Sequence, residues 1–435
     1  MRVQMPPTRR TCERRGVKLF VLVVLGIAAH ARADDTWITP IDQAALHVAA
    51  YDEADRAYSV PAHPRDITGE LAISCEHTEG RPCGDGVGTY GELDSRAGFG
   101  DWLSAGTRLR ARLGTDNYGS DVDIDRAHLD AHYRGFGFEL GRDAFVLGPG
   151  ARTNVSWSDH APPLDFVRAS YTNERGGLFY LVGRLRSPQT YPGNLVTIAR
   201  GEINLGPVTL GGMQLLQLEG DGAPHLGPWA FVEEHVTRGD PSAGPTDSSN
   251  RRVGIDASWR IAGFGGARFY YELMFEDWRR QFVDALRYDA DHVVGLDFPT
   301  ILIEWQQTGF RSMEHDPRIT GFTNAGRAVG SPLGPDAQAL YVALRAHSIT
   351  SWATPWAEFA RLANDTYTYG FHQPIVRTSD GLAEFRVRIG LRGTRALSPH
   401  LRIEAGAVTE TIFNFAFQHA ERHSIGGDVV LAWHP

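Results

Sequence analysis

Hydrophobic and polar residues alternate with a period of two along most of the chain from about residue 66 onward. In residues 103–113, leucine, alanine and threonine side chains share one face, whereas Arg108, Arg110 and Arg112 share the other. Later segments repeat this alternation. Because successive side chains of a β-strand point to opposite faces of the sheet, the pattern predicts strands of about ten residues with one apolar and one charged face.

The alternation predicts eighteen strands, and the links between them alternate in length. We expect the strands near residues 66–75, 87–97, 101–113, 122–134, 136–146, 164–173, 178–186, 196–205, 207–218, 251–261, 266–276, 292–298, 300–309, 339–347, 353–362, 382–395, 400–412 and 423–434. Short turns on one rim and long loops on the other are typical of outer-membrane barrels. The sequence therefore predicts an all-β protein, a transmembrane antiparallel β-barrel of about 18 strands over residues 66–435.

In such a barrel the apolar face meets lipid and the charged face lines the lumen. The arginines that we expect in the lumen are Arg108, Arg110, Arg112, Arg126, Arg168, Arg184, Arg200, Arg260, Arg268, Arg386, Arg388 and Arg402. Glu139, Asp256, Glu272, Glu276 and Glu304 are among the acidic residues beside them. These charges favour either a wall held rigid by ion pairs or a basic track for an acidic sugar polymer.

The N-terminus has the pattern of a cleaved signal peptide over residues 1–33. A basic stretch precedes the apolar run from Leu19 to Ala29, and Ala31-Arg32-Ala33 forms an A-x-A cleavage site. Residues 34–65 predict a short helical periplasmic segment, because Pro40 suits the first position of a helix. We therefore expect export to the outer membrane of a Gram-negative bacterium.

Charge and cysteine content exclude other classes of protein. Residues 1–33 carry seven basic residues and one acidic residue, so their removal takes the net charge from −9 to −15. So acidic a chain is not expected to bind nucleic acid. Cys75 and Cys83 remain in the exported chain, which favours a disulfide between them. No histidine ligands stand beside them, so we predict no metal and no cofactor.

The loop at residues 147–163 holds Ser156, Ser158, Asp159 and His160. Neighbouring positions in one loop rarely provide the geometry of a nucleophile, a base and an orienting group. We therefore predict no catalytic residue, and expect an ordered loop packed into or over the barrel.

Aromatic and basic residues in the long loops indicate a site for sugar, because sugar rings stack on aromatic faces and arginine pairs with carboxylates. A location in the aromatic girdle at the lipid headgroups is the alternative for some of the aromatic residues. The candidate polysaccharide-binding residues are Trp157, His160, Trp229, Trp278, Arg279, Arg280, Arg311, Tyr367, Tyr369 and His372.

Three stretches, taken with the strand rhythm, resemble the Wzi-type capsule assembly proteins over roughly residues 100–435. They are Leu147-Gly-Pro-Gly with the downstream Ser158-Asp-His-Ala-Pro-Pro-Leu164, Tyr270-Tyr-Glu-Leu-Met-Phe-Glu-Asp277, and Asn324-Ala-Gly-Arg-Ala-Val-Gly-Ser-Pro-Leu-Gly-Pro-Asp336. The resemblance implies an eighteen-stranded outer-membrane lectin without enzymatic activity, which anchors capsular polysaccharide. The family's helical periplasmic segment is reduced here to about one helix.

The leading hypothesis is a non-catalytic outer-membrane barrel that binds a surface polysaccharide and anchors or assembles it at the cell surface. Its expected partners are an acidic polysaccharide, outer-membrane lipid and the barrel-assembly machinery, which recognises C-terminal alternation such as that of Val429, Leu431 and Trp433. A porin or glycan-export pore is the alternative, and a barrel hydrolase is a third hypothesis.

Overall fold

The computed structural model describes residues 66–74, 88–99, 102–114, 121–158, 162–186, 191–223, 249–262, 266–276, 282–313, 321–324, 327–344, 353–370 and 373–433. The predicted signal peptide, the predicted helical segment at 34–65 and the predicted disulfide between Cys75 and Cys83 lie outside these residues.

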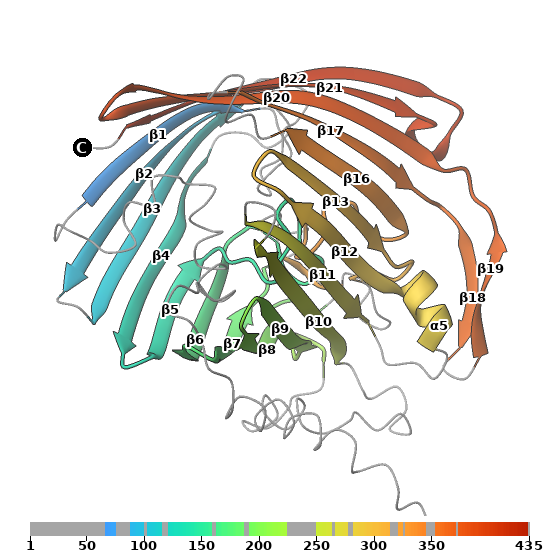
Figure 1. Ribbon diagram of the computed structural model, residues 1–435, viewed down its shortest axis with the longest axis horizontal. Coiled ribbons are helices and arrows are strands. Elements are labelled where there is room, and N and C mark those ends of the chain that lie inside the picture. Colours follow the sequence, from blue (N-terminus) through green and yellow to red (C-terminus); the bar gives the residue numbers. More distant parts are fainter. Residues whose placement is uncertain are drawn as a thin grey trace, which may run out of the picture.

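Eighteen strands form one sheet (Figure 1). The first nine are β1 (Asp66–Ser74), β2 (Gly88–Phe99), β3 (Leu103–Gly114), β4 (Asp121–Tyr133), β5 (Phe136–Asp143), β6 (Leu164–Asn173), β7 (Gly176–Arg184), β8 (Leu195–Leu205) and β9 (Val208–Leu218). The others are β10 (Asn250–Ile261), β11 (Ala267–Phe275), β12 (Ala290–Asp297), β13 (Ile301–Thr308), β16 (Ala337–Leu344), β17 (Ala353–Leu362), β20 (Glu384–Ser398), β21 (Leu401–Phe413) and β22 (Glu421–Trp433). The predicted fold class is confirmed.

The sheet closes on itself through its first and last strands. Strand β1 is antiparallel to both β2 and β22, and Gly69 lies opposite Trp433. Closure leaves no edge strand, so the backbone N–H and C=O groups of the wall pair within the sheet, as a bilayer requires.

The long links lie on one rim and the short turns on the other, as the sequence predicts. The long links also contain small elements that the alternation does not predict. They are α5 (Phe282–Asp284), η4 (Ala285–Asp289), the hairpin of β14 (Thr323–Asn324) and β15 (Arg327–Ala328), and the hairpin of β18 (Thr366–Gly370) and β19 (Gln373–Ser379). Within the described ranges, no helix has the length and apolarity needed to cross a bilayer.

The predicted strand phase is confirmed in the middle of the wall. Along β10, the outward side chains of Val253, Ile255 and Trp259 are 39–48% exposed, whereas Arg252 and Asp256 are buried on the lumen side. Large apolar side chains therefore form the outer surface, where they face lipid.

Strands β6 to β9 depart in part from the expectation that a charged face lines the lumen. Their inward side chains include Phe166, Leu181, Ile198 and Leu215, and these are buried in one hydrophobic cluster. Two long loops supply the opposite side of this cluster, as described below. An apolar lumen wall is stable here because these loops, rather than water, cover it.

Arg184, which the sequence places in the lumen, lies on the outer face. Its neighbour Leu185 faces inward and is 1% exposed, whereas Arg184 is exposed and stands opposite Asp165 and Leu195 in the sheet. The expectation fails because β7 is apolar on both faces, so alternation alone does not fix which side faces lipid.

Candidate functional site

The loop between β5 and β6 enters the barrel, and Glu304 on β13 holds it there. The Glu304 carboxylate accepts backbone N–H bonds from Ala151 at 2.8 Å, Arg152 at 3.0 Å and Thr153 at 2.9 Å. The hydroxyl of Tyr270 on β11 donates to the same carboxylate at 2.5 Å. One lumen carboxylate thus accepts the backbone hydrogen bonds of a whole turn, whose N–H groups do not pair with a neighbouring strand.

Glu272 on β11 holds the next turn in the same way. It accepts N–H bonds from Val155 at 3.1 Å and Ser156 at 2.9 Å, and the Ser156 hydroxyl also donates to it. The side chains of both Glu272 and Ser156 are fully buried. Residues 144–158 therefore form a plug that is docked on two carboxylates of the lumen wall.

The loop between β13 and β16 completes the plug. The N–H of Ser158 donates to the carbonyl of Val329 at 2.6 Å, and the Ser158 hydroxyl donates to the carbonyl of Gly330 at 2.5 Å. The Ser331 hydroxyl donates to the Gln306 side chain of the wall at 2.9 Å. We call the described residues 144–158 and 309–313, 321–324 and 327–336 the plug.

Arg252 on β10 ties the two halves of the plug together. Its guanidinium is fully buried, donates to the carbonyl of Val155 at 3.0 Å, and pairs with Asp291 and with Glu276. Glu276 in turn accepts the N–H of Met313 at 2.6 Å. Each buried charge here meets an opposite charge or a backbone group, as burial of ions requires.

Two glycines of the plug allow these close approaches. Gly148 has a φ of +117°, and a Cβ there would lie 2.4 Å from the Asn154 side chain and 2.7 Å from the Glu272 carboxylate. A Cβ on Gly330 would lie 2.0 Å from Met313 and 2.4 Å from the Val155 carbonyl. These two positions therefore require glycine, because a side chain there would collide with the wall carboxylate or with the other plug loop.

Trp157 lies in the hydrophobic cluster between the plug and strands β6 to β9. Its indole is 2% exposed and stacks on Phe145 with ring centroids 4.8 Å apart. Its carbonyl accepts the N–H of Leu147 at 2.9 Å. In this structure the side chain that the sequence suggests for sugar contact presents no free face, and instead anchors the plug.

Ser156 and Ser158 lie in the same buried plug, with both hydroxyls committed to the hydrogen bonds described above. Neither hydroxyl faces a solvent-filled cleft, so neither is placed as a nucleophile. Asp159 and His160 lie outside the described residues. Among the described residues, no cluster of three or more His, Cys, Asp or Glu side chains is arranged to hold a metal ion.

The rest of the lumen wall favours the ion-paired interpretation over an open basic track. Charged pairs form along the wall at 2.5–3.6 Å, either between strands or within one strand, and they include Arg108–Asp94, Arg110–Asp125, Arg168–Glu139, Arg200–Asp256, Arg268–Asp297, Arg388–Glu410 and Arg402–Glu404. These arginines donate to wall carboxylates, which limits their availability to a polymer.

An aromatic cluster lies on the long-loop rim and includes the plug residues Phe310 and Arg311. Phe310 stacks on Tyr367 with ring centroids 4.5 Å apart, and Tyr288 lies 5.9 Å from Tyr367. The guanidinium of Arg287 lies 4.9 Å from the Tyr288 ring, and that of Arg311 lies 5.7 Å from the Phe310 ring. We call these five residues the rim cluster.

Backbone contacts fix the rim cluster in place. The N–H of Phe310 donates to the carbonyl of Tyr288 at 2.8 Å, which joins the start of β12 to the end of β13. Arg311 forms a bidentate pair with Asp289 at 2.9 and 2.6 Å. The three rings are half-buried and Arg287 is exposed, so the cluster offers aromatic edges and a cation on a rigid base.

A phenol–carboxylate contact orients Tyr367 in the cluster. Its hydroxyl donates to Asp336 at 3.1 Å. Burial and the nearby Asp336 carboxylate raise the pKa of the Tyr367 phenol, so it stays protonated and remains a donor at neutral pH. Burial and the neighbouring Asp365 carboxylate also raise the pKa of Asp336.

The structure brings together two of the residues predicted for sugar contact, Arg311 and Tyr367, through Phe310. For Tyr369 the structure describes only the backbone, within β18. The remaining predicted residues lie outside the described part of the chain, and they are His160, Trp229, Trp278, Arg279, Arg280 and His372.

Sequence reasoning missed Tyr288, Phe310 and Arg287. A signal was present, because Arg287-Tyr288 precedes the β12–β13 hairpin and Phe310-Arg311 follows it. The first residues of a hairpin and the last ones lie next to each other, at the end away from the turn. Arg287-Tyr288 and Phe310-Arg311 are therefore expected side by side on the same rim.

Comparisons with known proteins agree with this architecture. The family model described as "Capsule assembly protein Wzi" matches residues 63–348, which include the three sequence stretches noted above and thus confirm the resemblance. Part of the plug (residues 147–150, 158, 324 and 327–336) and Glu272 of β11 lie in these same stretches. No curated protein sequence matches the chain significantly.

Among solved structures, the chain is similar to an Escherichia coli protein described as Wzi, an outer membrane protein involved in group 1 capsule assembly and a carbohydrate-binding β-barrel. The two are 13% identical, with 92% of this chain and 89% of that chain covered and a TM-score of 0.61, which shows a common fold. OccK10 (OpdN) of Pseudomonas aeruginosa is 11% identical, with 85% and 98% covered and a TM-score of 0.48.

Proposed function

Because the chain belongs to the Wzi capsule assembly protein family, we propose that it is a closed, non-catalytic outer-membrane barrel that holds an acidic polysaccharide at the cell surface. The rim cluster carries this proposal, because it presents aromatic rings and arginine on the rim where the long loops gather. The E. coli relative is described as a carbohydrate-binding barrel, which supports a glycan as the ligand.

The plug supports retention of the polymer rather than its passage. Two loops enter the lumen and are held by Glu272, Glu304 and Arg252, all of them buried. A porin or an export pore needs a water-filled channel. The described lumen instead contains a hydrophobic core and ion pairs.

Retention would come from many weak contacts. A ring stacked on an aromatic side chain and an exposed ion pair each contribute about 0.5–1 kcal/mol. A polymer with repeating units engages many barrels at once, so avidity rather than one tight pocket holds it. The predicted loop residues Trp229, Trp278, Arg279, Arg280, His160, Tyr369 and His372 would extend the rim cluster.

Export and assembly complete the proposal. Residues 1–33 would act as a signal peptide in a Gram-negative bacterium, and the barrel-assembly machinery would recognise the last strand. Val429, Leu431 and Trp433 of β22 are outward-facing and 38–47% exposed, which gives that strand the alternation such a signal needs.

We expect the combined replacement of Tyr288, Phe310 and Tyr367 by alanine to lower binding of an isolated acidic polysaccharide about tenfold or more, because three stacking faces are lost. Each single alanine variant should change binding by only a few-fold. Binding to immobilised polymer, titrated at several salt concentrations, measures both effects, and binding should weaken as salt rises.

The matched control is the Trp102→Ala/Tyr133→Ala variant, since these aromatic side chains are 57% and 65% exposed at the opposite, short-turn rim. Heat-modifiable migration on gels confirms that each variant is folded. Full binding by the triple variant, or an equal loss in the control, would refute the assignment of the rim cluster.

A further inference from the structure

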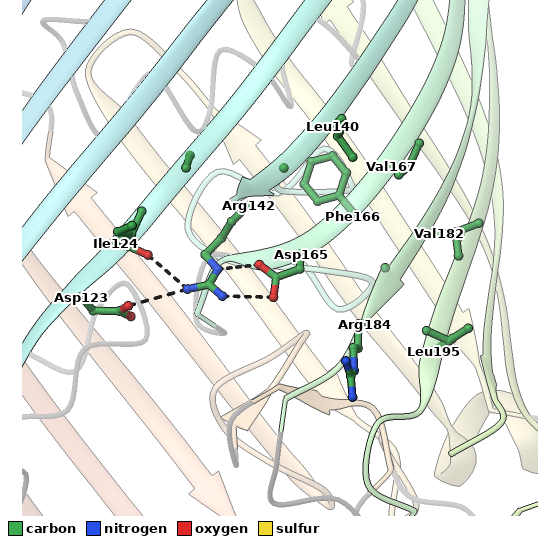
Figure 2. A pocket seen from close by; sticks show the side chains of 13 residues that line it. Asp123, Ile124, Leu140, Arg142, Asp165, Phe166, Val167, Val182, Arg184 and Leu195 are labelled. Atoms are coloured by element: carbon green, nitrogen blue, oxygen red, sulfur yellow. Dashed lines mark hydrogen bonds and ion pairs between the residues drawn. The ribbon is translucent and has the colours of Figure 1, made fainter. Parts of the chain in front are cut away.

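A row of charged residues crosses the outer wall of the barrel at the long-loop ends of β5, β6 and β7. The sheet register places Arg142 opposite Asp165, and Asp165 opposite Arg184. Figure 2 shows these three side chains beside one another, with Asp123 of β4 on the far side of Arg142. Because they share one face with Leu140 and Val167, which are 47% and 40% exposed, the row faces outward.

The two arginines of this row differ in their contacts. Arg142 donates to the Asp165 carboxylate at 2.5 and 3.1 Å and to the carbonyl of Ile124 at 3.2 Å. Arg184 is exposed and makes no ion pair or side-chain hydrogen bond within the described residues, and no dashed line reaches it in Figure 2. Its guanidinium therefore keeps its donors for a ligand.

A second arginine, Arg186, lies next to the row but is held by the loop rather than facing the groove. Arg186 follows Arg184 by two residues, and its Nη2 donates to the carbonyl of Pro163 at 3.1 Å. Its Nε is buried and has no hydrogen-bond partner in the described part of the chain. Asp123, Asp125 and Asp165 equal Arg142, Arg184 and Arg186 in number, but Arg184 has no carboxylate partner among the described residues, so one arginine of the outer face keeps an uncompensated charge.

Aliphatic side chains lie directly on the membrane side of the charged row. Leu140, Val167 and Val182 stand two residues closer to the middle of the wall, which is about 7 Å along a strand. With Leu195 and the charged row they line a shallow groove of about 630 Å³ (Figure 2). A charged strip thus meets an apolar strip on one outward surface.

The level of this groove in the membrane follows from the cost of exposed charge. An arginine facing hydrocarbon near the midplane costs about 2–4 kcal/mol, and the cost falls towards zero at the interface. Arg142 and Arg184 lie at the strand ends nearest the long loops, so they stand level with the headgroups of the outer leaflet. Phosphate groups of lipids lie at this level, and arginine binds phosphate through two parallel hydrogen bonds.

We propose that this groove binds a phosphorylated lipid of the outer leaflet, whose phosphate accepts hydrogen bonds from Arg184 while an acyl chain lies along Leu140, Val167 and Val182. A polysaccharide fits less well, because the groove wall is aliphatic and faces lipid rather than the rim. The site is separate from the rim cluster and does not depend on the polysaccharide function.

The test is native mass spectrometry of the full chain in detergent micelles, titrated with lipid A that carries two phosphates. Arg184→Gln should weaken binding about three- to tenfold, which is the effect of one partly exposed charge-assisted contact. Asp165→Asn should strengthen binding, because it removes a carboxylate that competes with phosphate for the arginines. Both variants must first show the heat-modifiable migration of a folded barrel.

Arg395→Gln is the matched control, since Arg395 is an exposed arginine of β20 near the opposite rim. It should bind lipid A as the unaltered protein does, and dephosphorylated lipid A should bind both proteins weakly. Equal binding of phosphorylated and dephosphorylated lipid, an equal loss in Arg395→Gln, or no gain in Asp165→Asn would overturn the proposal. Displacement of the lipid by millimolar inorganic phosphate would assign the site to the free ion instead.

Discussion

Replacing both Glu272 and Glu304 by alanine should turn a barrel that passes little current into an open pore. Together these carboxylates accept five backbone N–H bonds from residues 151–156, and both are buried. Hydrogen bonds to a charged acceptor contribute about 1.5–3 kcal/mol each, so each carboxylate should stabilise the docked loop by at least about 3 kcal/mol. Single-channel conductance in planar bilayers measures the release of the plug.

Glu139→Gln provides the control for this double variant. Glu139 is also a buried lumen carboxylate, but it pairs with Arg168 of the wall at 2.5 Å rather than with the plug. Its replacement should leave conductance low. If the Glu272→Ala/Glu304→Ala variant is folded and conducts no more than the unaltered protein, the hydrophobic cluster around Trp157 closes the lumen without the carboxylates.

The strands were predictable because a barrel wall imposes a period of two on every strand that has lipid on one side and polar groups on the other. On β10 this pattern is unambiguous, since Val253 and Ile255 alternate with Arg252 and Asp256. On β7 and β8 the inward positions Leu181 and Ile198 are as apolar as the outward positions. Alternation of hydrophobicity cannot distinguish the two faces there, which is why Arg184 was misplaced.

The candidate site was harder to predict, because loops have no period that fixes the direction of a side chain. Trp157 and Tyr367 both stand in long loops, yet Trp157 is a buried residue of the plug and Tyr367 lies in the rim cluster. The groups on which each loop docks decide this difference. For the plug these groups are Glu304 and Glu272, which are more than a hundred residues away in the sequence. The sequence did predict an ordered loop at 147–163 packed into or over the barrel, and the structure shows residues 147–158 inside it.

The sequence stretches that resemble the family acquire a physical reason in the structure. The glycines of the first stretch let the loop approach Glu272, the second stretch contains Tyr270 and Glu272, and the third contains Gly330. Stretches that are distant in sequence are therefore parts of one contact, the docking of the plug on the wall.

An arginine introduced on the lipid face of the wall should destabilise the barrel more than an arginine introduced on the lumen face. Ile389 of β20 is 56% exposed near the middle of its strand, and Val408 of the neighbouring β21 is half-buried on the lumen side, one register position away. Ile389→Arg should destabilise the barrel by about 2–4 kcal/mol, because the guanidinium would face hydrocarbon. Val408→Arg should destabilise the barrel less, because Glu410 lies two residues along the same face and its carboxylate can pair with the new guanidinium.

Urea unfolding of the two variants in lipid vesicles, followed by loss of heat-modifiable migration, measures the difference. Ile255→Arg on β10 and Leu109→Arg on β3 should cause the same loss that we expect for Ile389→Arg, since these side chains are 46% and 43% exposed on the outer face. A one-residue slip of any strand exchanges its two faces, so the comparison is sensitive to register. Equal stability of Ile389→Arg and Val408→Arg would show that the outward face of β20 and β21 does not meet lipid.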